Sequence, residues 1–481
     1  MVAKQPSQMN APQSAVWSRF AIVLFGMLCL TEAAKLVAFH QAGPMPRVSD
    51  AAAYWRLGTQ VASGDIWMTD HAVAYRTPGY PWFLGLMQAA CGPWAWCIAV
   101  AVQYVAVWLT TMLTGWWTWR VTGRPWLAVA AVAVCVLSAA RASHASILLT
   151  ETLFTLWLTL TGVLLCQSAA LVRPRSTVVV AAVWCLAWIT RPVAAALIPA
   201  WLVAWWWPAG DRSFMRTKSL AVALTAAVLA VGLGPWIVRN VLVWQRPALT
   251  VFLGRELWVT TFGPGQPDPP GLPATPEADD LVRRVSPDGK FTDWRGNWSV
   301  SNGLTASGLS DVAADELMGR VARQAIAADP LRAGQRGVWR AIDYWRATYL
   351  RSMADYDQPT DSEAVIRDEQ RLWGRDGYRR FRTAWLESAP ERRLLVTELA
   401  SVLALLGLAG LWLSPATIRF AAIGTALVVG VALATAIVEY PAYRYRMVLE
   451  PVLIVCGISG WAILIDVIRR GRRSLWQESP P

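Results

Sequence analysis

Repeated long apolar stretches are the feature that most constrains how this chain can fold. They recur through the first half of the sequence and again near its end, and several approach the roughly 20 residues that cross a hydrocarbon core as a helix. Hydrophobic residues make up 55% of the chain and charged residues only 16%, against about 25% in an ordinary soluble domain. We therefore expect an all-α polytopic membrane protein.

The apolar stretches predict about ten transmembrane helices. The expected ranges are 17–39, 93–119, 126–142, 147–168, 177–190, 193–207, 219–238, 395–413, 420–438 and 447–468. The N-terminus is polar up to Trp17, and the first apolar run is too long for the hydrophobic region of a removable signal peptide. The first run is therefore expected to stay in the protein as a span.

Basic residues predict the orientation of these helices. With a cytoplasmic N-terminus, the short inner loops and the C-terminal tail carry the arginines and lysines that the positive-inside rule requires. These residues are Arg120, Arg124, Arg173, Arg175, Arg212, Arg216, Lys218, Arg419, Arg469, Arg470, Arg472 and Arg473. Both termini are thus expected in the cytoplasm, below an inner or plasma membrane. The net charge of +12 then reflects topology, and no nucleic-acid partner is expected.

Two regions are predicted outside the membrane. An N-terminal membrane module at 1–238 would contain a first outer loop at 40–92, and a region at 239–394 is too long for a structureless loop. We expect the second region to be an extracytoplasmic domain of mixed or mainly helical structure. The C-terminal helices would occupy 395–468, followed by a basic cytoplasmic tail at 469–481.

Local signals predict some structure within the two outer regions. The first contains a Pro-rich turn at 43–46 and a helical pattern at 49–61. In the second, a Pro/Gly-rich linker covers 263–276, and Asp329 and Pro330 predict the N-cap and first residue of a helix running to about residue 351. The triplet Asn297-Trp298-Ser299 matches a glycosylation acceptor pattern, but so short a motif is expected by chance.

Ionisable residues at the outer ends of the spans are candidates for function, because burying a charge at membrane depth is expensive. Asp50 follows the first span in SDAAAYW, and Glu151 opens the fourth span in LLTETLF. Five arginines are expected on the same side, against the positive-inside bias: Arg76, Arg191, Arg239, Arg444 and Arg446. Neighbouring tyrosines complete the expected substrate pocket: Tyr54, Tyr75, Tyr80, Tyr443 and Tyr445.

Carboxylates beside arginines at the outer leaflet favour chemistry on a phosphorylated lipid. A guanidinium fork matches phosphate oxygens, and a nearby carboxylate can take a proton from an attacking hydroxyl. The same residues also suit a transporter or flippase of a lipid-linked sugar, or a non-catalytic protein that binds a polyprenyl lipid. A transporter would need a polar pathway through the membrane, whereas the inner parts of the predicted spans carry few ionisable residues.

Six motifs, in order along the chain, resemble one family. They are SDAAAYW, RTPGYPWFLGL, LLTETLF, ITRP, GPWIVRN and YRYRMVLEP. Over nearly all of its membrane part the chain is similar to the polyprenyl-phosphate-sugar-dependent membrane glycosyltransferases of the C superfamily (GT-C). That superfamily includes protein mannosyltransferases and the aminoarabinose transferase that acts on lipid A. The resemblance implies a hexosyl- or pentosyltransferase that passes a sugar from a polyprenyl-phosphate donor to a glycan, lipid or protein acceptor on the extracytoplasmic face.

The resemblance also implies roles for the candidate residues. Asp50 takes the position of the catalytic base, and Glu151 that of a second acid, which in some relatives helps to bind a metal or orients the acceptor. Five arginines are assigned to the donor phosphate: Arg76, Arg444 and Arg446, with Arg239 assisting and Arg191 as a further contact. No cofactor is implied with certainty, and a divalent metal is left open.

Simpler structural roles are the alternatives. Asp50 would only cap the helix that follows it, Glu151 would pair with an arginine to lock two spans together, and Arg191 would be an end residue that snorkels to the interface. The histidines are His40, His71 and His144. They are interpreted as unrelated surface residues, because their spacing matches no compact metal-ligand motif.

Overall fold

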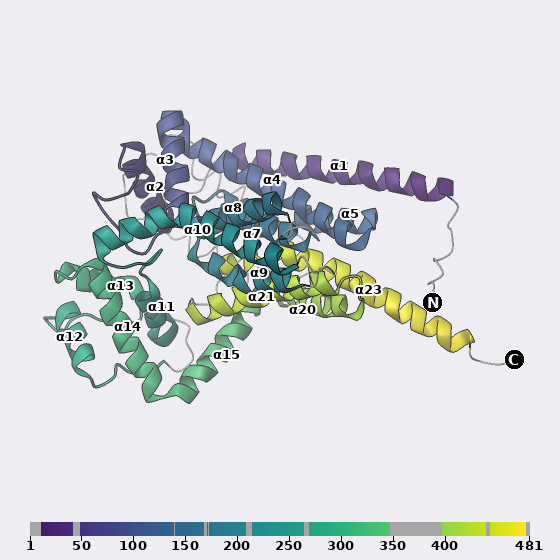
Figure 1. Ribbon diagram of the computed structural model, residues 1–481. Helices are drawn as coiled ribbons and strands as arrows, with labels where there is room; N and C mark the ends of the chain where they lie inside the picture. Colours follow the sequence, from purple (N-terminus) through teal and green to yellow (C-terminus); the bar gives the residue numbers. More distant parts are fainter. Residues whose placement is uncertain are drawn as a thin grey trace.

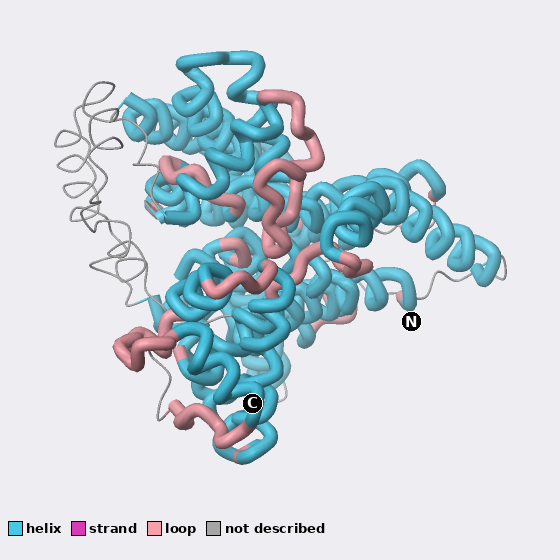
Figure 2. Tube along the Cα trace, turned by 90° about the vertical axis from the view of Figure 1, so that its left-hand side faces the viewer, coloured by secondary structure: helices cyan, strands magenta, loops and turns pink. Residues whose placement is uncertain are grey.

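The fold is helical throughout the part of the chain that the structure describes. The computed structural model describes residues 11–41, 49–138, 140–167, 171, 173–207, 214–263, 269–346, 397–438 and 443–477. Every regular element in these ranges is a helix, and Figure 2 accordingly draws only helices and loops. The all-α prediction is confirmed for these residues. The predicted turn at 43–46, part of the linker at 263–276 and the portion of 239–394 beyond residue 346 lie outside them.

Each predicted span overlaps an apolar helix. Five helical segments are long and apolar enough to cross a membrane, as an integral membrane protein requires. They lie in α1 (Ala11–Gln41), α3 with α4 (Gly79–Cys91 and Ala95–Thr122), α10 (Phe214–Trp244), α21 (Ile418–Val438) and α23 (Glu450–Gln477). The shorter ones are α5 (Pro125–Leu137), α7 (Glu151–Cys166), α8 (Pro174–Thr190), η2 with α9 (Pro192–Leu197 and Ile198–Trp206) and α20 with η3 (Thr397–Gly410 and Leu411–Leu413). The count of ten spans stays a prediction.

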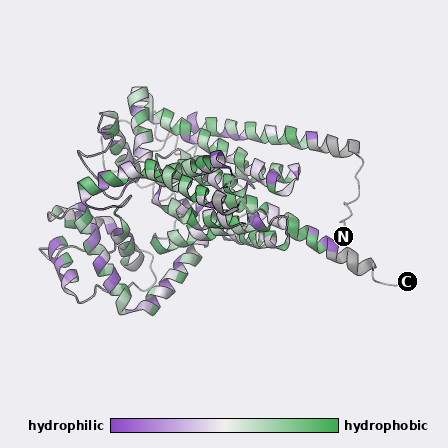
Figure 3. Cartoon of the chain, viewed as in Figure 1, coloured by the Kyte–Doolittle hydropathy of each residue, from purple (hydrophilic) through white to green (hydrophobic). Residues whose placement is uncertain are grey.

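The apolar helices form a bundle with a more polar group of helices at one end (Figures 1 and 3). The polar group contains α11 (Leu253–Phe262), α12 (Pro276–Val285), α13 (Asn297–Ala306) and α14 (Asp311–Ala328). The N-terminal end of α1 and the C-terminal end of α23 lie at the opposite end of the bundle (Figure 1). This arrangement is compatible with the predicted topology, in which both termini lie across the membrane from the large outer region.

Close helix contacts in the bundle depend on small residues. A Cβ added to Gly407 in α20 would lie 2.5 Å from the carbonyl oxygen of Gly457 in α23, a distance that no side chain tolerates. Lipid tails are as apolar as leucine, so helices associate in a membrane chiefly through such close packing. The largest apolar core of the bundle joins residues of α4, α7, α8, α9, α21 and α23, among them Trp117, Phe154 and Leu427.

The first outer loop contains the predicted helix at 49–61, observed as α2 (Ser49–Ala62). Tyr54 of α2 packs against Tyr80 of α3 in an edge-on contact, with ring centroids 5.1 Å apart. The loop is also joined to the second outer region through Ala74. Its amide donates to the Asp311 carboxylate at 2.9 Å, and its carbonyl accepts from the Val251 amide at 2.7 Å.

The helices α11 to α14 enclose an apolar core of their own, which includes Trp258, Leu281, Val300 and Met318. Three helices of this outer region have N-termini capped by side chains that satisfy otherwise unpaired amides. The caps are Thr275 on α12, Ser310 on α14, and Asp329 on α15 (Pro330–Arg346), whose carboxylate accepts from the Arg332 amide at 3.0 Å. The predicted helix start at Asp329 and Pro330 is confirmed. The boundaries proposed for the outer domain stay a prediction.

Candidate active site

A cavity of about 710 Å³ lies where the bundle meets the first outer loop and the α11–α14 region. Its walls come from segments far apart in the sequence, including α2, α7, η2, α11, α21 and α22 (Tyr443–Met447). Most of the residues predicted for the site line it: Asp50, Tyr54, Tyr75, Arg76, Glu151, Arg191, Arg444 and Tyr445. The fold therefore brings together charged residues that the sequence separates by nearly 400 positions.

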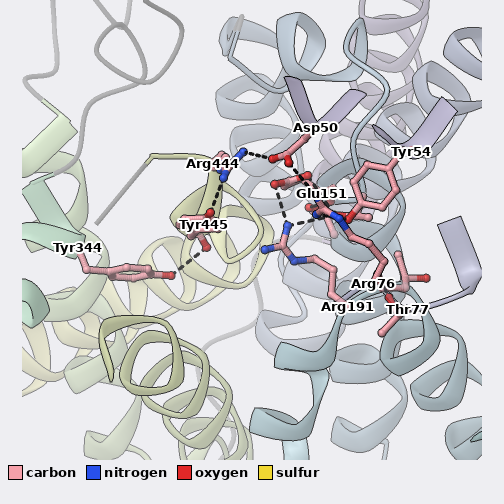
Figure 4. A network of polar contacts seen from close by, with 12 residues as sticks. Asp50, Tyr54, Arg76, Thr77, Glu151, Arg191, Tyr344, Arg444 and Tyr445 are labelled. Carbon is pink, nitrogen blue, oxygen red and sulfur yellow. Dashed lines mark hydrogen bonds and ion pairs between the residues drawn. The ribbon is translucent and has the colours of Figure 1, made fainter. Parts of the chain in front are cut away.

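The Asp50 carboxylate is held between two guanidinium groups (Figure 4). Arg76 Nη2 lies 2.5 Å from Asp50 Oδ1, and Arg444 Nη1 lies 3.2 Å from Oδ2. Burial alone would raise the pKa of Asp50, but the two arginines outweigh burial and hold that pKa well below its usual range. Asp50 is therefore a carboxylate at neutral pH, able to accept hydrogen bonds and protons but not to donate them.

Tyr54 supports this arrangement from the next turn of α2. Its hydroxyl accepts a hydrogen bond of 3.0 Å from Arg76 Nη1, and the Arg76 guanidinium lies 4.5 Å from the centroid of the Tyr54 ring. A guanidinium packed over an aromatic face gains a cation–π attraction. Arg76 is thus fixed by Asp50 and Tyr54 together, in an orientation that leaves it lining the cavity.

A second ion pair lies beside the first. Arg191 Nη1 is 2.7 Å from Glu151 Oε1 and 3.1 Å from the Thr150 hydroxyl, and Glu151 is almost fully buried. Arg191 ends α8 with an extended backbone (φ −146°, ψ 133°), as expected for a residue that precedes proline. Pro192 thus stops the helix where the Arg191 side chain reaches Glu151 at the start of α7. The pairing of Glu151 with an arginine is confirmed, and that arginine is Arg191.

Arg444 and Tyr445 close the site from the C-terminal part of the chain. Arg444 Nη2 donates to the Tyr445 hydroxyl at 2.5 Å, while the Tyr445 carbonyl accepts from the Tyr344 hydroxyl at 3.1 Å (Figure 4). The Arg191 guanidinium lies 5.3 Å from the centroid of the Tyr445 ring. Tyr445 therefore contacts cations from both ion pairs and joins them into one network.

Three of the predicted residues lie outside the cavity lining. Arg239 donates to the carbonyls of Trp67 at 3.0 Å and Met68 at 2.6 Å, and so fixes the first outer loop. Arg446 is buried and donates to the Trp345 carbonyl at 2.5 Å. Tyr80 is buried, with its hydroxyl donating to the Gln103 side chain at 2.7 Å. The side chain of Tyr443, also predicted for the pocket, lies outside the described residues.

The structure corrects two simpler interpretations. Asp50 does not cap the helix, since α2 begins at Ser49 and the Asp50 carboxylate bonds to two arginines instead of to backbone amides. His144 is not a surface residue, because it is only 1% exposed.

The described residues do not fit a resident metal site. None of them forms a group of three or more His, Cys, Asp and Glu side chains that could hold an ion. Asp50 and Glu151, the two carboxylates predicted for the site, each pair with arginine, which offsets the charge that a cation would need. The guanidinium groups of Arg76, Arg191 and Arg444 line the same cavity as these two carboxylates.

Sequence reasoning missed the outer wall of the cavity. This wall comes from the second outer region and includes Phe252, Glu256, Arg295, Asn297 and Trp298. Asn297 and Trp298 belong to the triplet interpreted as a chance glycosylation motif. A tryptophan in an otherwise polar outer segment was the available signal.

A buried charged cluster within the bundle was also missed. Lys35 of α1 lies 2.6 Å from the Glu32 carboxylate, and its ammonium donates to the carbonyls of Val136 at 3.0 Å and Ser138 at 2.9 Å. Those carbonyls lie at the break between α5 and α6 (Ala140–Ala145), where helical partners are missing. Because lipid offers no hydrogen bonds, these carbonyls need a donor within the protein, and the Lys35 side chain provides it. None of these four residues lines the cavity.

Comparison with protein-family models and with curated proteins gives no match. Among solved structures, the chain is similar to ArnT from Cupriavidus metallidurans, in a crystal structure bound to undecaprenyl phosphate and in another of the apo state. The identities are 14% and 15%, the alignments cover 91% and 90% of this chain and 77% of the other chain, and the TM-score is 0.38 in both. A TM-score of 0.38 describes a loose superposition, which establishes neither the family nor the activity of this chain.

Proposed function

We propose that this chain is a membrane glycosyltransferase of the GT-C type, which transfers a sugar from a polyprenyl-phosphate donor to an acceptor at the extracytoplasmic face. The observation that carries the proposal is the position of Asp50, a carboxylate held between Arg76 and Arg444 in a cavity at the end of a bundle of apolar helices. The motif resemblance in the sequence points the same way.

The charges of the network suit a phosphodiester. Three arginines, Arg76, Arg191 and Arg444, face two carboxylates, Asp50 and Glu151, which leaves one positive charge in the paired set. A sugar linked to a polyprenyl chain through one phosphate carries one negative charge. We therefore assign the donor phosphate to these three arginines. Arg239 and Arg446, whose guanidiniums bond to backbone carbonyls, are left out of the assignment.

The membrane side of the cavity suits the lipid part of the donor. Its lining includes Val193 and Ala196 of η2 and Val431 and Val438 of α21, both elements that belong to the apolar bundle. A polyprenyl chain would lie against these residues, since apolar groups gain about 25 cal/mol for each Å² that they bury away from water. The phosphate would then sit at the arginines and the sugar beyond them, toward α11 and α13.

Asp50 is assigned as the general base. As the acceptor hydroxyl oxygen bonds to the anomeric carbon, its proton passes to Asp50, and the bond from the anomeric carbon to the phosphate oxygen breaks. The electron pair of that bond leaves with the polyprenyl phosphate, whose added charge the arginines stabilise. A donor phosphate bound at Arg76 and Arg444 would take some of the hydrogen bonds that these arginines give to Asp50. Losing them raises the pKa of Asp50, so the carboxylate becomes a stronger base once the donor is bound.

The test is direct release of the lipid product. Purified protein is incubated with a panel of polyprenyl-phosphate hexoses and pentoses, and free polyprenyl phosphate is measured with and without a membrane extract as acceptor source. We expect release from at least one donor, and release lowered by about 10² to 10⁴-fold in the Asp50→Asn variant. Movement of intact donor across vesicle membranes, with no release from any member of the panel, would instead support a flippase.

A further inference from the structure

Three aromatic rings form a cluster on the outer wall of the cavity. The ring centroid of Trp298 lies 4.9 Å from that of Tyr75 and 5.7 Å from that of Phe252, and Tyr75 and Phe252 are 5.6 Å apart. All three residues line the cavity. Trp298 keeps 36% of its surface exposed, whereas Trp258 in the neighbouring core is fully buried. The outer region therefore presents an aromatic surface to the cavity in addition to the aromatic residues it buries.

A buried cation behind the cluster fixes the rings. The Arg255 guanidinium lies 5.4 Å from the Tyr75 ring centroid and 5.8 Å from that of Trp298. Arg255 is completely buried, and its side chain bonds to Ser301 at 2.8 Å and pairs with Asp311. Arg255 is absent from the cavity lining, so it supports the rings from behind and is not itself a contact for a ligand.

Polar side chains border the aromatic cluster. Glu256, Arg295 and Asn297 line the same part of the cavity. Sugar rings need this combination, because their weakly positive C–H groups pack on the electron-rich faces of aromatic rings while their hydroxyls require polar partners. A prenyl chain would instead require an apolar wall without charged neighbours. The composition of the outer wall thus favours a saccharide over a lipid.

The cluster adjoins the network assigned to the phosphate. Tyr75 directly precedes Arg76, which pairs with Asp50, and the Arg76 guanidinium lies 5.2 Å from the Tyr75 ring centroid. In the donor, the sugar is bonded directly to the phosphate. We propose that the aromatic cluster of Tyr75, Phe252 and Trp298, with the polar residues beside it, is the subsite for the donor's sugar ring. This inference rests on the proposed function for its donor, and it assigns the outer region the role of selecting the sugar.

The subsite can be tested without turnover. Full-length protein in detergent is examined by saturation-transfer NMR with methyl glycosides of hexoses and pentoses as probes. We expect at least one probe to bind, Trp298→Ala to weaken its binding about tenfold, and Trp298→Phe to retain most of it. A tenfold change corresponds to about 1.4 kcal/mol, which is within the range of an aromatic contact. Trp339→Ala is the matched control, since Trp339 is 52% exposed and does not line the cavity. If no methyl glycoside binds in a way that depends on Trp298, the inference is wrong.

A competition experiment shows whether the subsite binds the donor's sugar or the acceptor's sugar. A polyprenyl-phosphate sugar added to the probe should displace it, whereas plain polyprenyl phosphate should leave most of it bound. Simultaneous binding of the probe and the sugar-bearing donor would overturn the assignment to the donor and place the acceptor's sugar there. Probe binding needs no catalysis, so the two tests fail separately. If the protein releases no polyprenyl phosphate, the proposed function is wrong. The comparison of wild type with the Trp298 variants still decides whether the cluster binds a sugar.

Discussion

Replacing Asp50 with asparagine separates the catalytic role of this residue from its structural one. Asparagine has nearly the same shape and keeps one acceptor oxygen for Arg76 or Arg444, but it carries no charge and does not take a proton. General-base catalysis typically contributes about 10² to 10⁴-fold. We therefore expect Asp50→Asn to lower turnover by about that factor, which corresponds to roughly 3 to 5 kcal/mol in the activation free energy.

Donor binding should respond in the opposite sense. In the free protein Asp50 accepts hydrogen bonds from Arg76 at 2.5 Å and Arg444 at 3.2 Å, so it competes with a donor phosphate for the same guanidiniums. Removing the carboxylate charge leaves these donors to the phosphate. We expect the dissociation constant for polyprenyl phosphate to stay the same or fall, while kcat drops. If the role of Asp50 were only structural, the Asp50→Asn variant would lose binding of polyprenyl phosphate and thermal stability together.

The pH dependence supplies an independent check. The pKa of Asp50 is depressed by Arg76 and Arg444 below the ordinary value of about 3.9. A depressed pKa means that the carboxylate's ion pairs contribute their full stability above that ordinary value and lose it only as pH falls through the lower folded pKa. Between about pH 5 and 8, Asp50 of the free protein should therefore stay ionised. An acid limb of kcat/KM in that window that disappears in Asp50→Asn would contradict this argument.

The assay compares release of polyprenyl phosphate by purified wild type, Asp50→Asn and the control Asp70→Asn. Asp70 is an exposed carboxylate of the same outer loop and does not line the cavity, so its substitution should leave turnover unchanged. Binding of polyprenyl phosphate and the melting temperature are measured on the same preparations. Near wild-type turnover in Asp50→Asn would refute the general-base assignment and make Glu151 the next carboxylate to test.

The remaining predictions address the phosphate contacts, the buried ion pair and the topology. Arg444→Lys should weaken binding of polyprenyl phosphate about tenfold, since an ammonium does not reproduce the guanidinium fork, while Arg446→Lys leaves binding unchanged; equal losses in both variants would contradict the assignment. Lys35→Met, which leaves the Glu32 charge buried without its partner, should destabilise the protein by about 3 to 5 kcal/mol, and adding Glu32→Gln should recover most of the loss, as thermal unfolding in detergent will show. A reporter fused at Gly271 should be extracytoplasmic, and a cytoplasmic signal there would overturn the proposed side of the active site.

Much of the fold could be predicted because membrane helices are specified locally. A run of apolar residues long enough to cross the bilayer can pair all of its own backbone amides and carbonyls only as a helix. The length and composition of the run therefore locate the helix in the sequence. Helix ends were less predictable. The span expected at 219–238 is part of α10, which continues to Trp244, because the polar residues Arg239 and Asn240 find partners in the first outer loop and in the turn after the helix.

The site residues were predicted in kind, but not always in place. Charges at the outer ends of spans identified Asp50 and Glu151, yet Arg444 and Arg446 were assigned together. Successive residues of a helix are turned by about 100°, so side chains two positions apart differ by about 200° and do not face the same cavity. In α22, Arg444 faces Asp50 while Arg446 bonds to the Trp345 carbonyl. Helical periodicity could have shown that only one of the two arginines faces the cavity, although it could not have shown which one.

The outer wall required contacts that no local pattern contains. Trp298 meets Tyr75 where two hydrogen bonds of Ala74, one to the Asp311 carboxylate and one from the Val251 amide, tie the first outer loop to the second outer region. On the proposed function, this connection has a mechanistic consequence. The same loop that places Tyr75 against the sugar places Arg76 against the phosphate and Asp50, so the position of the sugar and the orientation of the base are set together. A change in the outer region that shifts the loop should then alter sugar selection and turnover jointly, even though the membrane helices that hold Glu151 and Arg191 stay in place.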